Sequence, residues 1–329
     1  MSTDRRSVDT SHDVLLVCSG GGHLRQLAGF AERLGIEPDR QVWATFRNGL
    51  SESLLAGRRV EYIPFTAPRD LPNVARVTRV ARRLLKNATF AAALSTGSSP
   101  AVAFLPLASR KGIPCFYIES AARADGPSVT GRIIARFPGI RTHCQYPSWA
   151  GRRWQYVGSV FDGFEPGART GTTTPRRAVV SVGTQVGYPF IRLFERIVPM
   201  LADFDEVMYQ TGDADVSHLG ITGVETVPHS ELEDAIREAD VVITHAGVGA
   251  ALTALSAGKH PIMVPRSVAH GEHIDDHQLQ IARELDRRRL ATMRFVDNLV
   301  AQDLVDASMR SAHTIVPPPI VLDVRLTER

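Results

Sequence analysis

Cysteine is scarce in this chain, because only Cys18, Cys115 and Cys144 occur among 329 residues, each alone in an apolar stretch. No CxxC spacing is present, so we expect buried, reduced thiols and neither a disulfide framework nor a cysteine metal site. Long apolar runs are also missing: no stretch approaches the ~20 apolar residues that a membrane helix needs. The polar start MSTDRRSVDTSHD lacks the apolar segment of a signal peptide. We therefore expect a cytoplasmic protein.

The composition, 43% hydrophobic and 22% charged, is that of a globular protein. A single core rarely grows beyond roughly 250 residues, so this length predicts two domains. The net charge of +3 is unevenly spread. Residues 1–165 hold 22 Lys and Arg against 13 Asp and Glu, whereas residues 166–329 hold 16 against 22. The basic half indicates an anionic partner, for which nucleic acid, a membrane surface and a phosphorylated substrate all qualify.

Short β-branched runs alternate with helical segments, which is the pattern of parallel crossover connections. We expect strands at 13–18, 41–46, 59–65, 91–95, 114–119 and 141–146, and then at 178–182, 206–210, 224–227, 240–244 and 261–264. The stretch 158–177 is rich in Gly, Pro, Ser and Thr and lacks periodicity. The sequence therefore predicts two α/β domains, 1–160 and 178–329, joined by a linker at 161–177. Ligands of such sheets bind at the carboxyl ends of the strands, in a cleft between the domains.

The first expected strand runs into a glycine turn, SGGG at residues 19–22, and then into a helix. Gly21 and Gly22 let backbone N–H groups approach a ligand closely, and a helix amino terminus favours negative charge. His23 follows, and an imidazole titrates near neutral pH, so it is a candidate general base for a hydroxyl nucleophile. The alternative is a glycine turn beside a solvated histidine, because the spacing is not the GxGxxG of dinucleotide binders.

Two more glycine turns follow expected strands in the second half, and either could cradle a diphosphate. Their residues are Gly183, Thr184 and Gln185 in one turn, and His245, Gly247 and Gly249 in the other. A second turn in the first half contains Gly97. The next expected strand ends at Glu119, which is followed by Ser120 and Arg123. Glu119 is a candidate general base, a hydroxyl-binding group or a helix-capping partner, and the sequence leaves these open.

A dense polar cluster follows Arg266, and its members are His270, Glu272, His273, Asp275, Asp276, His277 and Gln278. Its histidines lie three and four residues apart, which permits a metal site. We instead favour hydrogen bonds to the hydroxyls of a sugar and expect no metal. A capped, solvated helix start, in which Asp275 and Asp276 complement the helix dipole, is the plainer alternative.

The basic excess of the first half is concentrated in residues 71–90. On a helix, one face would carry Arg76, Arg79, Arg83 and Lys86, beside an apolar face. A solvated helix face is the ordinary interpretation, and an anionic membrane surface or a lipid diphosphate comes next. We do not expect nucleic acid, because no basic platform interleaved with aromatic residues is present.

At this point the motifs, taken in order, resemble a known family of enzymes. SGGGHL, STG-SSPAV, GIPCFYIES-A-R-PS-TGR and YVGSV resemble the acceptor-side subunit of the two-subunit N-acetylglucosaminyltransferase of the dolichol pathway and its bacterial exopolysaccharide counterparts. VSVGTQ, ADVVITHAGVGAAL-AL-AGK-PI-VPR and GEH-DDHQ resemble the donor-side subunit. Both are related to the peptidoglycan N-acetylglucosaminyltransferase. The resemblance runs from about residue 13 to about residue 290, so the chain resembles a fusion of the two subunits.

The resemblance implies a GT-B fold with two Rossmann-like domains. It also implies a metal-independent, inverting transfer of a sugar from a UDP-sugar to a polyprenyl-diphosphate-linked saccharide, without a cofactor. The site would lie at the cytoplasmic leaflet, with the chain peripheral at the inner face of the plasma membrane and its basic helix on the anionic surface. The first domain would bind the acceptor, with His23 or Glu119 as base and with Gly21, Gly22, Gly97, Ser120 and Arg123. The second would bind the UDP-sugar through Gly183, Thr184, Gln185, His229, Leu232, His245, Gly247, Gly249, Thr253, Arg266, Glu272, Asp276, His277 and Gln278.

One departure from the family pattern concerns the ribose of the donor. Relatives carry a glutamate in the helix after the HAG-type turn, where this chain has Thr253. The alternatives are a UDP-sugar 2-epimerase, a transferase acting on a soluble natural product, and a silent nucleotide-sugar-binding subunit. The transferred sugar is not readable from the sequence, although Arg266 could pair with the carboxylate of a uronic acid.

Overall fold

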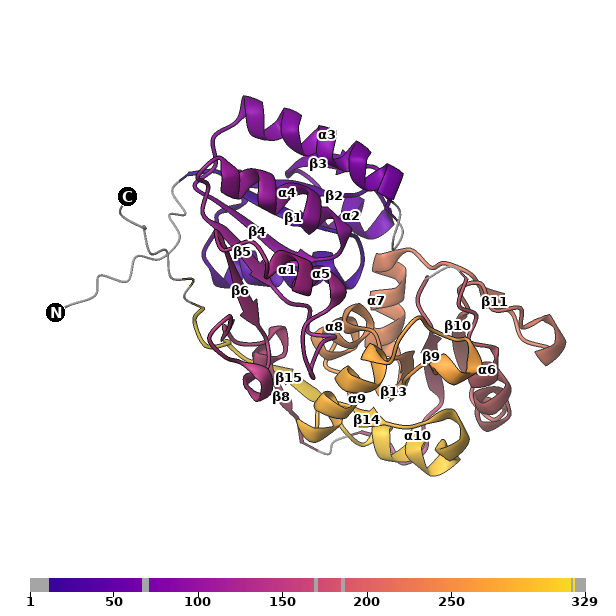
Figure 1. Cartoon of the computed structure of the whole chain (residues 1–329). Coiled ribbons are helices and arrows are strands. Elements are labelled where there is room, and N and C mark those ends of the chain that lie inside the picture. Colours follow the sequence, from indigo (N-terminus) through magenta and orange to yellow (C-terminus); the bar gives the residue numbers. More distant parts are fainter. Residues whose placement is uncertain (1–11, 67–70, 169–170, 185–186, 321, 323–329) are drawn as a thin grey trace. The chain divides into compact units, whose positions relative to one another are not determined.

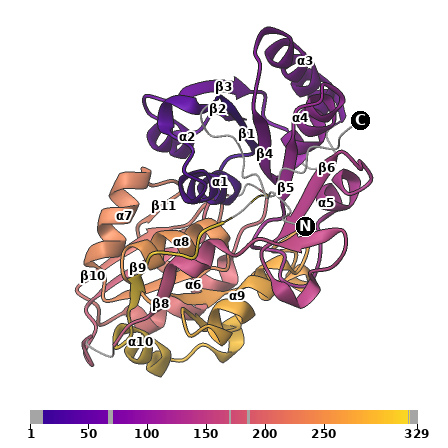
Figure 2. The same cartoon turned by 90° about the vertical axis from the view of Figure 1, so that its left-hand side faces the viewer.

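The structure is a computed structural model of the chain, and it describes residues 12–66, 71–168, 171–184, 187–320 and 322. The chain forms two compact units, each with its own sheet and core (Figures 1 and 2). The first unit holds the chain up to Val160 and the segment from Pro317 onward, and the second unit is Phe161–Val316. Within the described ranges, no helix combines the length and the apolar character needed to cross a membrane.

The first unit is built on a seven-stranded parallel sheet in the order β3-β2-β1-β4-β5-β6-β7. Its strands are β1 (Val14–Cys18), β2 (Gln41–Phe46), β3 (Arg59–Ile63), β4 (Ala92–Gly97), β5 (Cys115–Ile118), β6 (Ile140–Cys144) and β7 (Trp154–Tyr156). The order reverses between β1 and β4, and such a switch point is where open α/β sheets bind ligands.

Helices cover both faces of this sheet (Figure 1). They are α1 (Gly22–Arg33), α2 (Gly49–Leu54), α3 (Leu71–Asn87), α4 (Ser99–Arg110) and α5 (Val129–Ile134). Successive residues of a strand point to opposite faces. Leu15 and Val17 therefore pack with α3, α4 and α5, whereas Leu16 packs with α1 and with Ile320 and Leu322 from the end of the chain.

The second unit has a six-stranded parallel sheet in the order β11-β10-β9-β12-β13-β14. Its strands are β9 (Arg177–Ser181), β10 (Glu206–Gln210), β11 (Gly223–Val224), β12 (Val241–His245), β13 (Ile262–Val264) and β14 (Thr292–Met293). The helices are α6 (Ile191–Ile197), α7 (His229–Glu238), α8 (Val248–Ser256), α9 (His277–Arg287) and α10 (Ala301–Ser308). Val180 faces the core under α6 and α10, and Val179 faces α7 and α8. Here the strand order reverses between β9 and β12.

The expected domain boundaries, 1–160, 161–177 and 178–329, need two corrections. The segment expected as a linker starts the second unit, because β8 (Phe164–Pro166) pairs antiparallel with β15 (Ala312–Thr314) of the same unit. The described residues from Pro317 to Leu322 belong to the first unit, because Ile320 and Leu322 are buried in its core. Neither contact has a local sequence signal, since each joins segments far apart in the chain.

Candidate functional site

The switch point of the first sheet places the SGGG turn beside the end of β4. Gly21 has φ +63°, a backbone conformation that favours glycine, and nothing lies within 4 Å of the position that a Cβ would take. Gly21 is the N-cap of α1, which begins at Gly22. Beside it, Gly97 (φ +113°) and Ser98 (φ +65°) follow one another in the same unusual region. A non-glycine residue held there is strained, and strain of this kind concentrates at functional sites.

His23 is held at this point by the backbone of β4. Its Nδ1 lies 2.8 Å from the carbonyl oxygen of Thr96, and the Thr96 hydroxyl donates to the His23 carbonyl at 2.7 Å. A carbonyl only accepts, so the neutral ring carries its proton on Nδ1, and Nε2 is the basic nitrogen. The geometry therefore suits His23 to take a proton through Nε2.

Position 97 has no room for a side chain. A Cβ there would lie 3.0 Å from the Tyr117 hydroxyl and 3.2 Å from His23 Cε1. The close approach of the β4 turn to the His23 ring therefore depends on the missing side chain.

Glu119 is buried behind this turn, with 1% of its surface exposed. One carboxylate oxygen accepts from the Tyr117 hydroxyl at 3.2 Å and from the Ser120 N–H at 3.0 Å. The other accepts from the N–H and the hydroxyl of Ser128, at 2.9 and 3.0 Å. Burial raises the pKa of Glu119 above its ordinary value, although these donors favour the ionised form.

The structure consequently favours one of the roles left open for Glu119, because both oxygens hold the segment between β5 and α5. Ser128 is the N-cap of α5 and donates to Glu119, so the helix-capping interpretation fits. The base role expected as an alternative stays a prediction, although both carboxylate oxygens already accept hydrogen bonds within the unit. His23 is the candidate base that the geometry supports.

The remaining expected acceptor residues lie on the same edge of the first sheet. Ser120 is buried, and its hydroxyl accepts from Gln26 at 3.2 Å. Arg123 lies three residues further on, and its carbonyl accepts from Trp149 at 3.2 Å. Gly22 is linked in turn, because its carbonyl accepts from Gln26 at 3.0 Å.

Sequence reasoning missed Gln26, which joins these parts. Its amide nitrogen donates to Gly22 and Ser120, and its amide oxygen accepts from the Ala121 N–H at 2.7 Å and from Gln145 at 2.9 Å. This buried amide fixes α1, and hence His23, against the loop after β5. The available signal was a polar residue on the buried stripe of α1, between Leu24 and Leu27.

In the second unit the two expected glycine turns meet around one ring. A Cβ on Gly183 would lie 2.8 Å from His245 Cε1, and one on Gly247 would lie 2.4 Å from His245 Nε2. Both glycines are therefore required by the His245 ring. Burial lowers the pKa of His245 to about 3, and the positive charge of Arg266 acts in the same direction, so the ring is neutral. Thr184 remains exposed beside it, and Gln185 lies outside the described residues.

The helix after the second turn is tightly packed. Gly247 is the N-cap of α8. Thr253 is buried, and its hydroxyl donates to the Gly249 carbonyl at 2.9 Å. Thr253 thus stabilises the first turn of α8 from within. His229 begins α7, and its Nε2 lies 2.9 Å from a carboxylate oxygen of Glu233. Leu232 of the same helix packs against the core around Val179.

Arg266 and Gln278 are joined through the backbone, since the Arg266 N–H donates to the Gln278 side-chain oxygen at 3.1 Å. Both side chains are buried. Glu272, expected to contact a sugar, is instead held by Arg192 at 2.9 Å and by the Ser267 N–H at 2.8 Å. It anchors the loop before α9, and the sugar contact that we expected of it stays a prediction.

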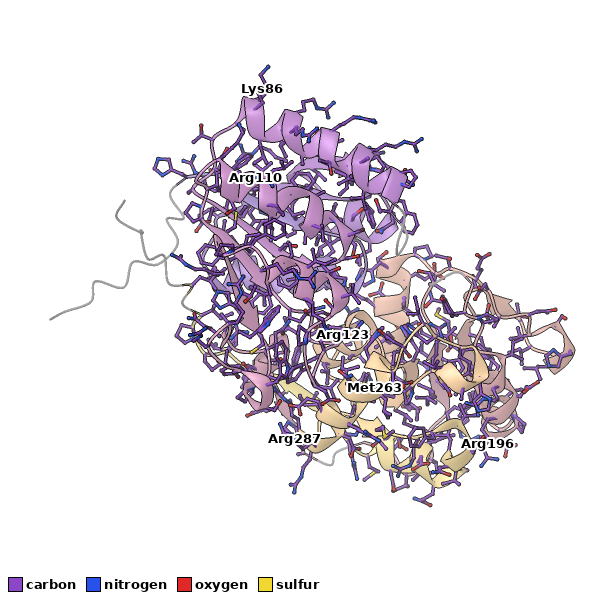
Figure 3. The ribbon with its side chains drawn as sticks, viewed as in Figure 1. Lys86, Arg110, Arg123, Arg196, Met263 and Arg287 are labelled. Carbon is purple, nitrogen blue, oxygen red and sulfur yellow. The ribbon has the colours of Figure 1, made fainter. Side chains whose placement is uncertain are left out.

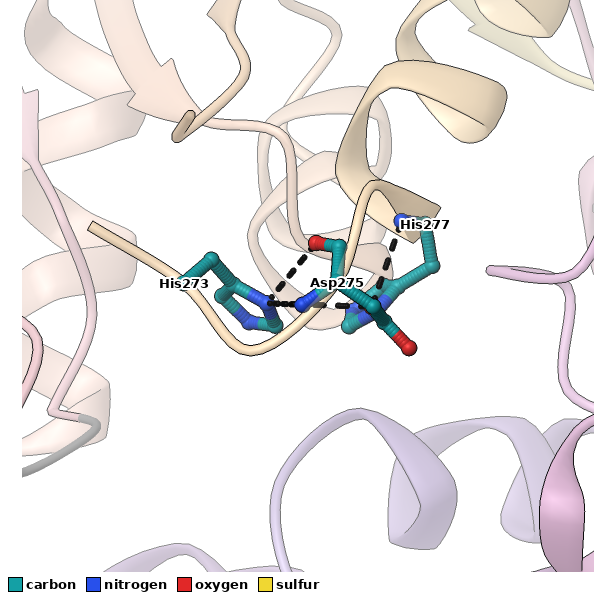
Figure 4. A group of neighbouring side chains, drawn as sticks. All are labelled: His273, Asp275 and His277. Atoms are coloured by element: carbon teal, nitrogen blue, oxygen red, sulfur yellow. Dashed lines mark hydrogen bonds and ion pairs between the residues drawn. The ribbon is translucent and has the colours of Figure 1, made fainter. Parts of the chain in front are cut away.

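His273, Asp275 and His277 form a compact group at the start of α9 (Figure 4). One ligand-type atom from each lies within 4.8 Å of the others, a spacing that could hold a metal ion. Hydrogen bonds within the group account for the closeness, because the imidazole of His277 bonds the Asp275 carboxylate and His273 Nδ1 lies 3.3 Å from the Asp275 N–H. Asp276 is the exposed N-cap and makes no side-chain capping bond. The absence of a metal therefore stays a prediction.

The predicted basic helix is α3. Arg76, Arg79, Arg83 and Lys86 are exposed, and Lys86 projects away from the ribbon (Figure 3). Arg83 forms an ion pair with Glu61. Val77, Ala81 and Leu85 are buried in the core shared with α4. The apolar face of α3 is thus used inside the unit, and its solvent face is basic.

Comparisons with known proteins agree with this architecture. Residues 177–312 match the family model described as Glycosyltransferase family 28 C-terminal domain. A curated relative, the UDP-N-acetylglucosamine transferase subunit ALG13 of Yarrowia lipolytica, is 42% identical over 71 residues. That alignment covers 22% of this chain and 33% of the relative, so the chain spans about a third of the length of the curated relative.

Solved structures match over most of the chain. MurG of Acinetobacter baumannii superposes with a TM-score of 0.57 at 18% identity, and 89% of each chain is covered. The glycotransferase of kitacinnamycin superposes with a TM-score of 0.58 at 17% identity, covering 90% of this chain and 89% of the other. The predicted fold class is confirmed: two parallel-sheet α/β units in a GT-B glycosyltransferase fold.

Proposed function

We propose that this chain is an inverting, metal-independent glycosyltransferase. It moves a sugar from a UDP-sugar to a hydroxyl of a polyprenyl-diphosphate-linked saccharide in the biosynthesis of a polysaccharide or glycoconjugate. The match to a glycosyltransferase C-terminal domain supports a UDP-sugar site in the second unit. His23 at the switch point of the first sheet is the observation that carries the transfer step. One chain would then combine the donor and acceptor functions of a two-subunit enzyme.

The donor is held by the second unit. Backbone N–H groups at Gly183 and at the start of α8, together with the helix dipole, favour the negative charge that develops as UDP leaves. The ring of His245 is neutral and closes the space between the two turns. Gln278, buried and fixed at the start of α9, is the group proposed to contact the sugar, with His277 beside it.

His23 acts as the general base in the chemical step. Nε2 accepts the proton of the acceptor hydroxyl as that oxygen attacks the anomeric carbon. The new carbon–oxygen bond forms on the face opposite the departing UDP, whose bond to the sugar breaks with the electron pair. A single displacement of this kind inverts the anomeric configuration. Glu119 contributes by holding the loop after β5, beside the acceptor residues Ser120 and Arg123.

The basic face of α3 is proposed to bring the first unit to an anionic membrane surface, where a lipid-linked acceptor would be found. Its four exposed cations supply the electrostatic attraction. The enzyme would accordingly act as a peripheral protein at the inner face of the plasma membrane.

The test is UDP release from a panel of UDP-sugars, with and without a polyprenyl-diphosphate-linked saccharide. We expect release that depends on the acceptor and that falls by about 10²–10⁴-fold in His23→Ala, the contribution of a general base. His218→Ala is the matched control, because His218 is exposed in the second unit. Failure of every UDP-sugar to bind would overturn the proposal, and interconversion of UDP-sugars without an acceptor would identify an epimerase.

Metal independence has its own test. EDTA should leave the rate unchanged, because backbone donors and helix ends neutralise the leaving group. If activity disappeared with EDTA and returned with a divalent cation, the group formed by His273, Asp275 and His277 would become the place to examine for a metal.

A further inference from the structure

Arg266 is the only arginine or lysine in the described part of the chain whose residue is buried, with 3% of its surface exposed. It lies two residues after the end of β13, at the edge of the second sheet where the glycine turns lie. Burying a guanidinium costs free energy unless acceptors surround it. The burial of the Arg266 guanidinium therefore has to be explained, whereas an exposed arginine is solvated by water.

The guanidinium is only partly satisfied. Its Nη2 donates to the Val182 carbonyl at 3.0 Å, and the group stands over the Phe190 ring at 5.6 Å. Nε and Nη1 have no hydrogen-bond partner, although both are buried. Buried polar atoms in folded proteins are nearly always paired, so two unpaired donors on one cation indicate a missing acceptor.

The carboxylates near Arg266 do not supply that acceptor. The negative charges of Asp213 and Glu272 interact electrostatically with the Arg266 guanidinium. Glu272 is held by Arg192, and Asp213 accepts from the Gly187 N–H at 2.5 Å. Arg266 forms no ion pair with any carboxylate that the structure describes.

The surroundings of Arg266 also fit a bound anion. Val182, its one carbonyl partner, immediately precedes Gly183 and the exposed Thr184. Asp213 lines a cavity of about 590 Å³ that also includes Thr211 and Gly212. A Cβ on Gly212 would lie 2.8 Å from the Gly183 carbonyl, so one residue of the cavity wall lies close to the same turn.

We propose that Arg266 is the anion-binding residue of the second unit and that its missing acceptor is an oxyanion of the bound nucleotide sugar. The inference rests on the proposed UDP-sugar donor. The oxyanion has two possible sources, the diphosphate or a carboxylate on the sugar. A planar guanidinium matches either one with parallel N–H donors. If the source is the diphosphate, Arg266 supplies the positive charge against which UDP departs.

Binding of UDP and of uridine to the full chain, measured by calorimetry, tests the proposal. A hydrogen bond to a charged group contributes about 10- to 100-fold in affinity. If the diphosphate is the anion, Arg266→Gln should weaken UDP by that factor and leave uridine unchanged. If it is a sugar carboxylate, UDP should bind as before, and UDP-glucuronic acid should lose affinity relative to UDP-glucose. Equal affinities of the variant and the native protein for all four compounds would overturn the inference.

Two controls separate the possible failures. Arg287→Gln removes an exposed arginine at the far end of α9 (Figure 3) and should change nothing. Arg266→Lys keeps the positive charge but lacks the planar guanidinium, so it should lose less affinity than Arg266→Gln. The lysine variant also keeps the test possible if the glutamine variant unfolds. A native chain that binds no UDP-sugar contradicts the proposed function. A native chain that binds UDP-sugars with unchanged affinity in both Arg266 variants contradicts only this inference.

Discussion

The position of His23 depends on a residue without a side chain. Gly97→Ala should disturb the site in two ways: φ +113° strains any other residue, and the added Cβ would lie 3.2 Å from His23 Cε1. We expect a loss of about 1–3 kcal/mol in the free energy of unfolding and a clear fall in kcat, because the His23 ring must move.

Gly112→Ala is the matched control for this change. Gly112 has φ +79°, but nothing lies within 4 Å of its Cβ position. This variant should lose stability through backbone strain alone, about 1–2 kcal/mol, and keep its kcat. Equal kcat values in the two alanine variants, by UDP release, would show that the contact with His23 does not matter.

Buried histidines give the fold a pH dependence. Burial lowers the pKa of His245 to about 3, and the pKa values of His143 and His260 to about 4, from an ordinary value of 6.5. Below pH 6.5 the unfolded chain binds protons that the folded chain does not, so stability present above pH 6.5 is lost as pH falls toward 4.

Each of these histidines adds at most about 1.4 kcal/mol per pH unit to this loss. Urea unfolding at pH 7.5, 6.0 and 5.0 measures the total. His260→Asn should reduce the slope, whereas His218→Asn, at an exposed site, should not. A free energy of unfolding that rises on acidification would contradict the assignment.

At the scale of elements, the residues of α3 that stabilise the fold and those that could attract an anionic surface lie on different faces of the helix. Its apolar residues are buried in the first core, and its cations face solvent. Arg79→Glu combined with Lys86→Glu should therefore leave the melting temperature nearly unchanged. Binding to vesicles containing phosphatidylserine should weaken about tenfold or more, since each cation near an anionic surface contributes about 1 kcal/mol.

The control for α3 is Arg237→Glu, an exposed arginine of the second unit. Vesicle co-sedimentation at low and high salt provides the measurement, because the difference between the variants should shrink as salt screens the charges. Equal binding of the α3 variant and the native chain at low salt would remove α3 from the proposed membrane contact.

The elements that sequence alone predicted best are the buried strands. All eleven expected strands exist in the structure, although β11 is only two exposed residues long. The central strands were visible because a strand covered on both faces is a continuous apolar run. The missed strands β7, β8, β14 and β15 are two or three residues long and largely paired at edges. The turns at Gly21, Gly97, Gly183 and Gly247 were also found, because glycine and the strand before it are both visible in the sequence.

The chemistry of individual side chains was less predictable. Nothing local to Glu119 showed that Ser128 would occupy its carboxylate, and nothing local to Glu272 showed that Arg192 would. Both partners come from other elements, so only the packed fold decides which polar groups remain available. The same reason explains why Arg266 could be named from the sequence, while its unpaired donors could not.

At the scale of the whole molecule, the segment that contains Pro318, Ile320 and Leu322 matters for the first unit. The sequence assigned residues 178–329 to one domain, but Ile320 and Leu322 are buried beside Leu24 and Phe30 of α1. Arg33 of α1 also donates to the Pro318 carbonyl at 2.8 Å. α1 carries His23, so a segment about 300 residues away in sequence supports the helix that positions the proposed base.

Leu322→Ala should therefore destabilise the first unit. Removing a fully buried leucine side chain costs about 2–4 kcal/mol, and Leu322 is completely inaccessible to solvent. Val316→Ala is the control, because Val316 is 93% exposed and should change the free energy of unfolding by less than about 0.5 kcal/mol. Hydrogen exchange gives the decisive readout: in Leu322→Ala, protection should fall in α1 and stay unchanged in α6 and α10 of the second unit. If protection fell in those helices and not in α1, the return of the chain end to the first core would be wrong.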